Sequence, residues 1–246
     1  MPGRRTPRST RWTCRSWHDQ DRIRPAPADG RLFVGIDPAG ASGSGDETVF
    51  AIRRGYKVIE LIAMRGQNDD AILAHAISFL ERYRLPRETP VVVIDREGPI
   101  GASLYGLMRG HVDRNTNAFE LVAVRVSDRA VRQPHIYDRM RDELTANLEA
   151  WIREGGAIPE DVKLASELHE IEWSVNTRGL LKTSAKDSLR KELGRSPDRY
   201  DAVALSAWEP LSMKDHVPVS ALNAERDEHE ERHSYDRTFD PYKGMR

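Results

Sequence analysis

The chain has 246 residues, of which 39% are hydrophobic and 31% charged, so it is long enough to bury one sizeable core. Its formal net charge of −1 excludes a protein that attracts nucleic acid through a strong overall basic field, so any polyanion must be held by local patches or by a partner. The single cysteine, Cys14, excludes a framework of intrachain disulfides and favours a reducing compartment, and no apolar stretch approaches the ~20 residues that a membrane helix needs.

The first half of the chain reads as a short meander of strands followed by alternation of helix and strand. Residues 1–30 are rich in arginine and proline, so we expect an irregular basic arm before one domain over 31–212 and a charged, mobile tail over 213–246. Apolar runs predict strands at 32–37, 48–53 and 56–64, the last two joined as a hairpin through Arg54 and Gly55. Asn68, Asp69 and Asp70 are suited to cap a helix with apolar positions up to Leu80. A continuous apolar run at 91–95 predicts a strand covered on both faces, followed by a helix over about 100–109.

The second half completes an α/β pattern. We expect a strand over 119–126, an amphipathic helix over 137–153 and a hairpin with strands at 167–175 and 180–183 that turns at 176–179. A short helix over 184–193 precedes a final helix that is capped by Ser196 and has Pro197 at its first position. This order predicts a mixed five-stranded sheet flanked by helices, with an added hairpin.

Three aspartates occupy places where a fold normally buries an apolar side chain. Asp37 and Asp95 end two apolar strands, and ligands in such folds sit outside the carboxyl ends of the strands. Asp201 shares a helix face with Ala204 and Leu205, which aims its carboxylate at the sheet. Buried carboxylates are usually paired or bound to metal, and carboxylates gathered around hard cations recur in enzymes that cut phosphodiesters. The alternative for Asp37 and Asp95 is a role as turn formers at strand ends.

Other candidate residues leave alternatives open. Asp198 is either a further ligand or a partner of the helix dipole, and Asp46 either touches the same site or closes the preceding loop. Lys182 and Lys186 precede the last helix and are either contacts for DNA phosphate or solvated side chains. The glycine-rich segment 40–45 leads into a strand, and no GxxxxGK[ST] motif occurs, so a P-loop ATPase is not supported.

Several short segments together resemble the nuclease domain of phage terminase large subunits. They are GIDPAG at 35–40, GDETV at 45–49, VID at 93–95, SAKD at 184–187 and SPDRYDA at 196–202, and the similarity spans about Leu32 to Trp208. The resemblance implies a ribonuclease H-like fold, related to Holliday-junction resolvases, in which three acids hold two Mg²⁺ or Mn²⁺ ions. Those acids map to Asp37, Asp95 and Asp201. Asp198 corresponds to an additional acid of resolvase-like relatives, and Asp46 to an auxiliary acid of some terminases.

The resemblance also implies a function. It is the cutting of concatemeric, double-stranded viral DNA during genome packaging in the host cytoplasm, with a packaging ATPase, a small terminase subunit and a portal as partners. We expect hydrolysis by two metal ions, with Asp37 bridging both and Asp95 and Asp201 each completing one ion's ligand set. The sequence shows no packaging ATPase, so we expect a separately encoded nuclease subunit, a fragment or a prophage remnant. The alternatives are a noncatalytic module that docks on DNA, the portal or a separate ATPase, and an actin-like or sugar-kinase-like phosphotransferase.

Overall fold

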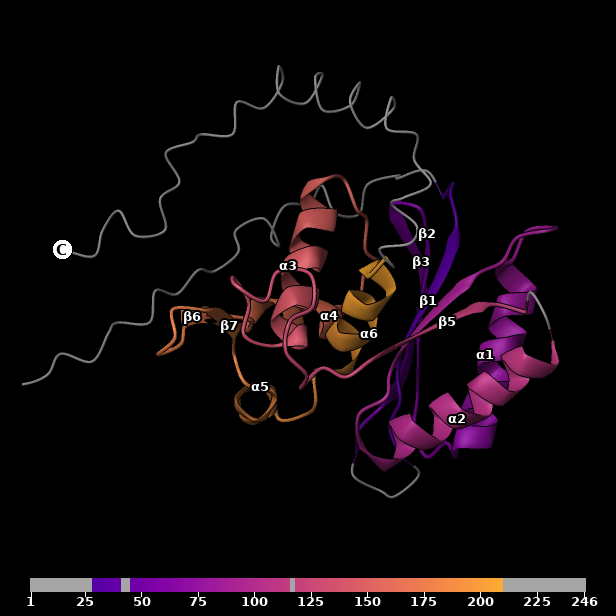
Figure 1. The fold of residues 1–246 in the computed structure, drawn as a ribbon, viewed down its shortest axis with the longest axis horizontal. Helices are drawn as coiled ribbons and strands as arrows, with labels where there is room; N and C mark the ends of the chain where they lie inside the picture. Colours follow the sequence, from indigo (N-terminus) through magenta and orange to yellow (C-terminus); the bar gives the residue numbers. More distant parts are fainter. Residues whose placement is uncertain (1–27, 41–44, 116–117, 210–246) are drawn as a thin grey trace, which may run out of the picture. The chain divides into compact units, whose positions relative to one another are not determined.

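The computed structural model describes residues 28–40, 45–115 and 118–209. Nearly all of the predicted basic arm, the centre of the glycine-rich loop and the whole predicted tail over 213–246 lie outside these residues. In chain order the elements are β1 (Leu32–Asp37), β2 (Thr48–Arg54), β3 (Lys57–Met64), α1 (Asp69–Tyr83), β4 (Val91–Asp95), α2 (Gly98–Arg114), β5 (Glu120–Val124), α3 (Met140–Arg153), α4 (Val162–His169), β6 (Trp173–Val175), β7 (Leu181–Thr183), α5 (Lys186–Leu193) and α6 (Asp198–Ala207) (Figure 1). None of the helices in the described ranges is long and apolar enough to span a bilayer.

A mixed sheet of five strands, in the order β3-β2-β1-β4-β5, organises the domain, and β6 and β7 form a separate hairpin. The pairs β1–β2 and β2–β3 are antiparallel, whereas β4 runs parallel to both β1 and β5. The register pairs Ile36 with Ile94, so the next residues, Asp37 and Asp95, end two adjacent parallel strands. The predicted mixed sheet, its helical flanks and the added hairpin are confirmed.

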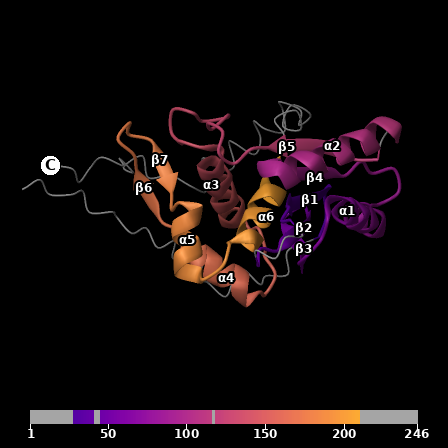
Figure 2. The same ribbon diagram turned by 90° about the horizontal axis from the view of Figure 1, so that it is seen from below.

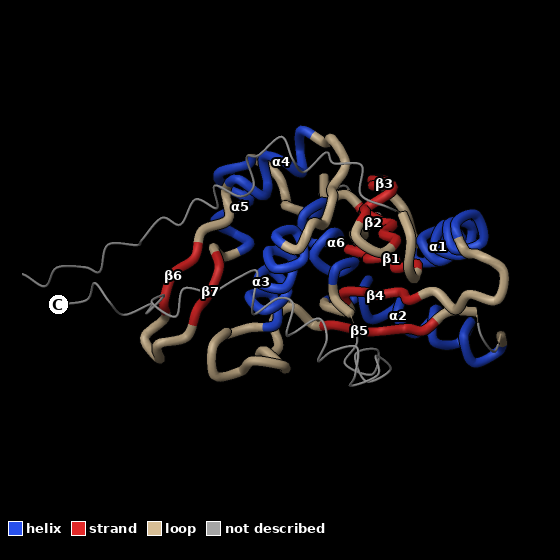
Figure 3. The backbone as a smooth tube through the Cα atoms, turned by 90° about the horizontal axis from the view of Figure 1, so that it is seen from above, coloured by secondary structure: helices blue, strands red, loops and turns tan. Residues whose placement is uncertain are grey.

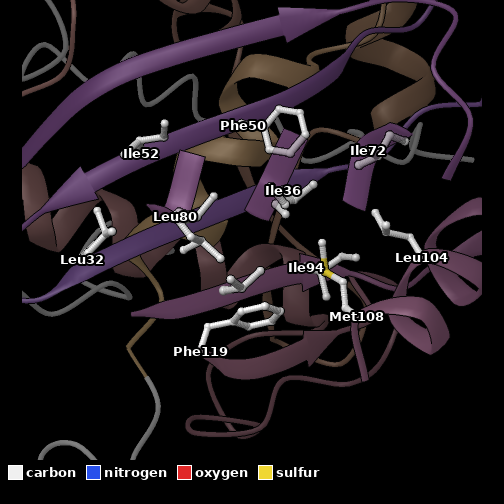
Figure 4. Packing of buried hydrophobic residues seen from close by; sticks show 13 residues of the cluster. Leu32, Ile36, Phe50, Ile52, Ile72, Leu80, Ile94, Leu104, Met108 and Phe119 are labelled. Carbon is white, nitrogen blue, oxygen red and sulfur yellow. The ribbon is translucent and has the colours of Figure 1, made fainter. Parts of the chain in front are cut away.

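The two faces of the sheet carry different helices. In Figures 2 and 3, α1 and α2 lie on one side of the strands, and α6, with α3 beyond it, lies on the other. Ile36 and Ile94 belong to the buried cluster that α1 and α2 complete with Leu104 and other apolar side chains (Figure 4). Because side chains alternate along a strand, the next residues of β1 and β4, both aspartates, face α6.

Gly35 allows α6 to lie directly on β1. A Cβ atom built at Gly35 would stand 2.2 Å from the carbonyl oxygen of Ala202 and 2.4 Å from the backbone nitrogen of Ser206. Helix and strand backbones therefore meet without an intervening side chain. This contact brings the first turns of α6, which carry Asp198 and Asp201, close to the carboxyl end of β1.

Three helices have boundaries that differ from the prediction. α2 runs over Gly98–Arg114 rather than 100–109, α3 begins at Met140 rather than at 137, and α5 begins at Lys186 rather than at 184. The later start of α3 has a clear cause, because the Asp142 carboxylate accepts the N–H of Arg139 at 2.9 Å and fixes the first turn there. The predicted apolar stripe of α3, from Met140 to Trp151, is buried.

The segment before the hairpin was predicted wrongly. Residues 162–169 form α4, with Asp161 as the N-cap accepting the N–H of Leu164 at 2.8 Å, and the first hairpin strand is only Trp173–Val175. The predicted turn at 176–179 is confirmed, because Asn176 accepts the N–H of Leu180 and donates its own to the Leu180 carbonyl. The cap of the last helix was also wrong: Pro197 holds the N-cap position and no side chain caps α6. At α1, Asn68 caps as predicted.

Candidate functional site

Four aspartates gather where β1 and β4 end and α6 begins. Each is less than a tenth exposed; they are Asp37, Asp95, Asp198 and Asp201. A cavity of about 800 Å³ opens beside them, and Asp37, Asp95 and Asp198 line it. The structure therefore brings together, at one end of the sheet, acids that are up to 164 positions apart in the sequence, from 37 to 201.

Lys186 stands between two of these acids. Its Nζ lies 2.6 Å from Oδ2 of Asp201 and 3.6 Å from Oδ2 of Asp37. Burial lowers the pKa of Lys186, but the carboxylates of Asp201 and Asp37 outweigh burial and raise that pKa above its ordinary value. Lys186, for which a contact with DNA phosphate and a solvated side chain were the two alternatives, is thus the counter-ion of the acidic cluster in this structure.

The carboxylates remain short of positive charge despite this lysine. Burial raises the pKa of Asp37 well above its usual range; Lys186 opposes the rise, and Asp201 and Asp198 add to it. Burial also raises the pKa of Asp95 to about 6, although its Oδ1 accepts the N–H of Glu97 at 3.0 Å. Acids that hold their protons this strongly are where an added cation is most favourable.

Asp198 and Asp46 are engaged differently. Oδ2 of Asp198 accepts the backbone N–H of Glu47 at 2.8 Å, and the Glu47 carboxylate is itself paired with Lys163 at 2.8 Å. Asp198 therefore fixes the segment that opens β2. Asp46 also lines the cavity, but its Oδ2 lies 2.7 Å from Nη2 of Arg190 on α5. Both acids reach the site, each with a partner of its own.

The lining of the cavity also has a basic part, the basic wall, which includes Lys182 of β7, Arg141 of α3 and Lys186. Nε of Arg141 lies 4.0 Å from Oδ1 of Asp201, a neighbour that sequence reasoning missed. Only its place beside the buried stripe of α3 hinted that Arg141 faces inward. The wall is anchored by Asp142, whose Oδ1 accepts both the N–H and the hydroxyl of Thr183 at 2.8 Å.

The carboxylate oxygens of the four aspartates suit a hard divalent cation once the Lys186 ammonium moves away. Carboxylate oxygens are the ligands that Mg²⁺ and Mn²⁺ prefer in proteins. As the side chains stand, the described residues contain no group of three or more acid, histidine or cysteine side chains poised around one point. The Lys186 ammonium takes the position between Asp37 and Asp201 that a shared cation needs, so the residues fit a metal that replaces this ammonium.

The sequence matches no family model and no curated protein, whereas the fold matches solved structures. The nuclease domain of the large terminase subunit gp2 of bacterial virus Sf6 is similar at a TM-score of 0.61 and 18% identity, over 80% of this chain and 97% of that one. A lysine-to-alanine variant of that domain with manganese and beta-thujaplicinol matches at a TM-score of 0.62 and 16% identity, over 75% of this chain and 90% of that one. The large terminase nuclease of thermophilic phage G20c with bound magnesium matches at a TM-score of 0.52 and 19% identity, over 75% of this chain and 82% of that one.

At these identities the likeness establishes the fold. The chain has the ribonuclease H-like fold of large terminase nuclease domains, as the resemblance of its motifs predicted.

Proposed function

We propose that the chain is a metal-dependent DNA endonuclease that cuts concatemeric viral DNA during genome packaging. The observation that carries this proposal is that Asp201 of α6 meets Asp37 and Asp95 at the carboxyl ends of two parallel strands, beside a cavity that basic side chains also line. Solved domains of the same fold that carry manganese or magnesium support it.

In this proposal Asp37, Asp95 and Asp201 would hold two Mg²⁺ or Mn²⁺ ions. When bound, such ions activate water and stabilise the charge on the departing oxygen of a phosphodiester. Asp198 keeps the start of β2 in place through the N–H of Glu47 and lines the same cavity, where its carboxylate would be an additional ligand. Asp46 has a similar auxiliary place on the cavity wall.

The basic wall has its own task in this proposal. Lys186, once released from Asp37 and Asp201, and the exposed Lys182 offer ammonium groups to the phosphates of double-stranded DNA lying in the cavity. A local basic wall is needed because the net charge of the chain is only −1. A packaging ATPase, a small terminase subunit and a portal are the partners that this function requires.

Plasmid cleavage tests the proposal. Supercoiled plasmid is incubated with the full chain and Mg²⁺ or Mn²⁺, and the wild type is compared with Asp95→Asn, which keeps the shape of the side chain. We expect metal-dependent nicking and linearisation that the variant largely loses, because an amide is a weaker ligand of Mg²⁺ than a carboxylate. Asp113→Asn is the matched control, because Asp113 is an exposed acid of α2 whose partner is Arg109 at 3.1 Å. Equal cutting by Asp95→Asn would refute the site, and no cutting by folded wild type would favour the docking module.

A further inference from the structure

The guanidinium of Arg141 is a buried cation that the proposed reaction leaves without a role. Arg141 lies in the first turn of α3, and only 12% of its side chain is exposed. Its Nη1 donates to the carbonyl of Ser184 at 3.3 Å, but Nε and Nη2 are buried and have no hydrogen-bond partner. Buried charged donors without partners are costly and rare, so this edge of the guanidinium is expected to serve a nearby acceptor.

Asp201 is the carboxylate that faces this edge, and the Tyr200 hydroxyl also interacts with the guanidinium. Nε of Arg141 lies 4.0 Å from Oδ1 of Asp201, about 1 Å beyond hydrogen-bonding distance. The other oxygen, Oδ2, is held by Lys186 at 2.6 Å. The carboxylate of Asp201 therefore stands between two cations, one on each oxygen, and only the lysine is close enough for a hydrogen bond.

The two cations differ in how firmly they are held. Lys186 is 32% exposed at the start of the eight-residue helix α5, and its ammonium also contacts Asp37. It occupies the space that a cation shared by Asp37 and Asp201 requires, so it must withdraw when such a cation binds. Arg141 lies on the other side of Asp201, more deeply buried, with its guanidinium carbon 6.0 Å from the ring centre of Tyr200. It has no need to leave.

We propose that Arg141 is the positioning residue of Asp201. As Lys186 withdraws, the side-on edge formed by Nε and Nη2 closes on Oδ1 of Asp201 and keeps Oδ2 directed at the metal. This edge presents two parallel donors, the geometry in which arginine binds a carboxylate most specifically. The inference rests on the proposed function, because it takes Asp201 to be a metal ligand. Partners that orient a ligand in this way typically change metal affinity 10–100-fold.

Mn²⁺ binding to the full chain without DNA tests the inference, with free Mn²⁺ followed by its paramagnetic resonance signal. We expect Arg141→Met to bind Mn²⁺ about 10–100-fold more weakly than the wild type. Arg141→Lys keeps the charge but lacks the paired donors, so it should recover only part of the loss. Arg139→Met is the matched control: it removes the same charge from the same cavity wall, where Arg139 donates to the Ser127 carbonyl at 2.7 Å, and should not weaken binding.

Each result decides the matter. If Arg141 acted only as a neighbouring positive charge, its removal would tighten Mn²⁺ binding, so equal or tighter binding by Arg141→Met overturns the inference. Should Arg141→Met fail to fold, as judged by circular dichroism, full wild-type affinity in Arg141→Lys overturns it equally. Asp201→Asn separates the two proposals. Unchanged Mn²⁺ binding in that variant refutes the proposed metal site itself, whereas its loss together with intact binding in both Arg141 variants refutes only the role of Arg141.

Discussion

Replacing Gly35 by alanine adds one methyl group at the point where α6 lies on β1. The new carbon would stand 2.2 Å from the carbonyl oxygen of Ala202 and 2.4 Å from the nitrogen of Ser206, where ordinary contact begins near 3.4 Å. Both atoms belong to the helix backbone, so no change of rotamer relieves the clash. The helix must move away from the strand by roughly 1 Å or the interface must open, because protein interiors have no spare volume.

The size of the effect follows from what overpacking costs. An added methyl in a packed core destabilises proteins by about 1–3 kcal/mol, and contact with two backbone atoms of α6 places Gly35→Ala at the upper end, about 3 kcal/mol. For a domain of this size that corresponds to a melting temperature lower by about 6–12 °C. Moving α6 also carries Asp201 away from Asp37, so DNA cleavage should fall even at a temperature where the variant is fully folded.

Urea and thermal unfolding measure the loss of stability, and Gly106→Ala supplies the matched control. Gly106 lies inside α2, and a Cβ there would meet nothing within 4 Å. The same chemical change should therefore stabilise the protein by up to about 1 kcal/mol through helix propensity. A Gly35→Ala variant as stable as the wild type would refute the direct packing of α6 on β1.

Three further predictions concern the charges of the site. Asp95→Asn should stabilise the metal-free protein at pH 8 but not near pH 4. In the wild type the folded pKa of Asp95, about 6, exceeds the unfolded value of 3.8, so the wild type loses up to about 3 kcal/mol of stability as the pH rises through this interval. Thermal unfolding in EDTA measures the difference. Lys186→Met should unfold earlier than the wild type in EDTA, by about 1–3 kcal/mol, and recover in saturating Mg²⁺, because a divalent cation replaces the lost ammonium. Thr183→Val should lower the free energy of unfolding, measured in urea, by about 1.5–3 kcal/mol, because Asp142 loses a hydroxyl donor.

Each of these has an outcome that contradicts it. A pH-independent gain in Asp95→Asn would show that burial of the carboxylate is not what destabilises the protein. A deficit in Lys186→Met that persists in Mg²⁺ would mean that the lysine supports packing rather than charge balance. Wild-type stability of Thr183→Val would show that Asp142 is satisfied without the hydroxyl group.

The strands and two of the acids were accessible from the sequence because their signals are local. The apolar runs before Asp37 and Asp95 predict strand ends, and the parallel pairing of β1 with β4 then places both carboxylates at one edge. The position of Lys186 between Asp37 and Asp201 was not predictable, because it depends on how a hairpin and a short helix fold back over the sheet. No spacing along the chain encodes that contact.

The helix boundaries that were missed also have physical reasons. α2 contains four glycines, one of them at its first position, so residues 98–114 have a weak helix propensity, yet the helix is stabilised by burying Leu104 and Met108 in the core. Gly101 is required there, since a Cβ would stand 2.6 Å from the carbonyl oxygen of Asp95. α4 has only eight residues, and burial of Leu164 and Leu168 supports it. In both helices the local propensity is weak, and tertiary packing decides that the helix forms.

Metal binding and DNA binding should strengthen each other through Lys186. A divalent cation shared by Asp37 and Asp201 displaces the ammonium, which then needs a new anion on the cavity wall, and a DNA phosphate supplies one. Because coupling between two ligands is reciprocal, Ca²⁺ should tighten duplex binding by about 5–150-fold, and DNA should tighten Ca²⁺ binding by the same factor. Fluorescence anisotropy of a labelled duplex, with and without Ca²⁺, measures the coupling. In Lys186→Met the enhancement should shrink markedly, since no ammonium is released; an undiminished enhancement would show that the metal acts on DNA directly and that Lys186 does not link the two sites.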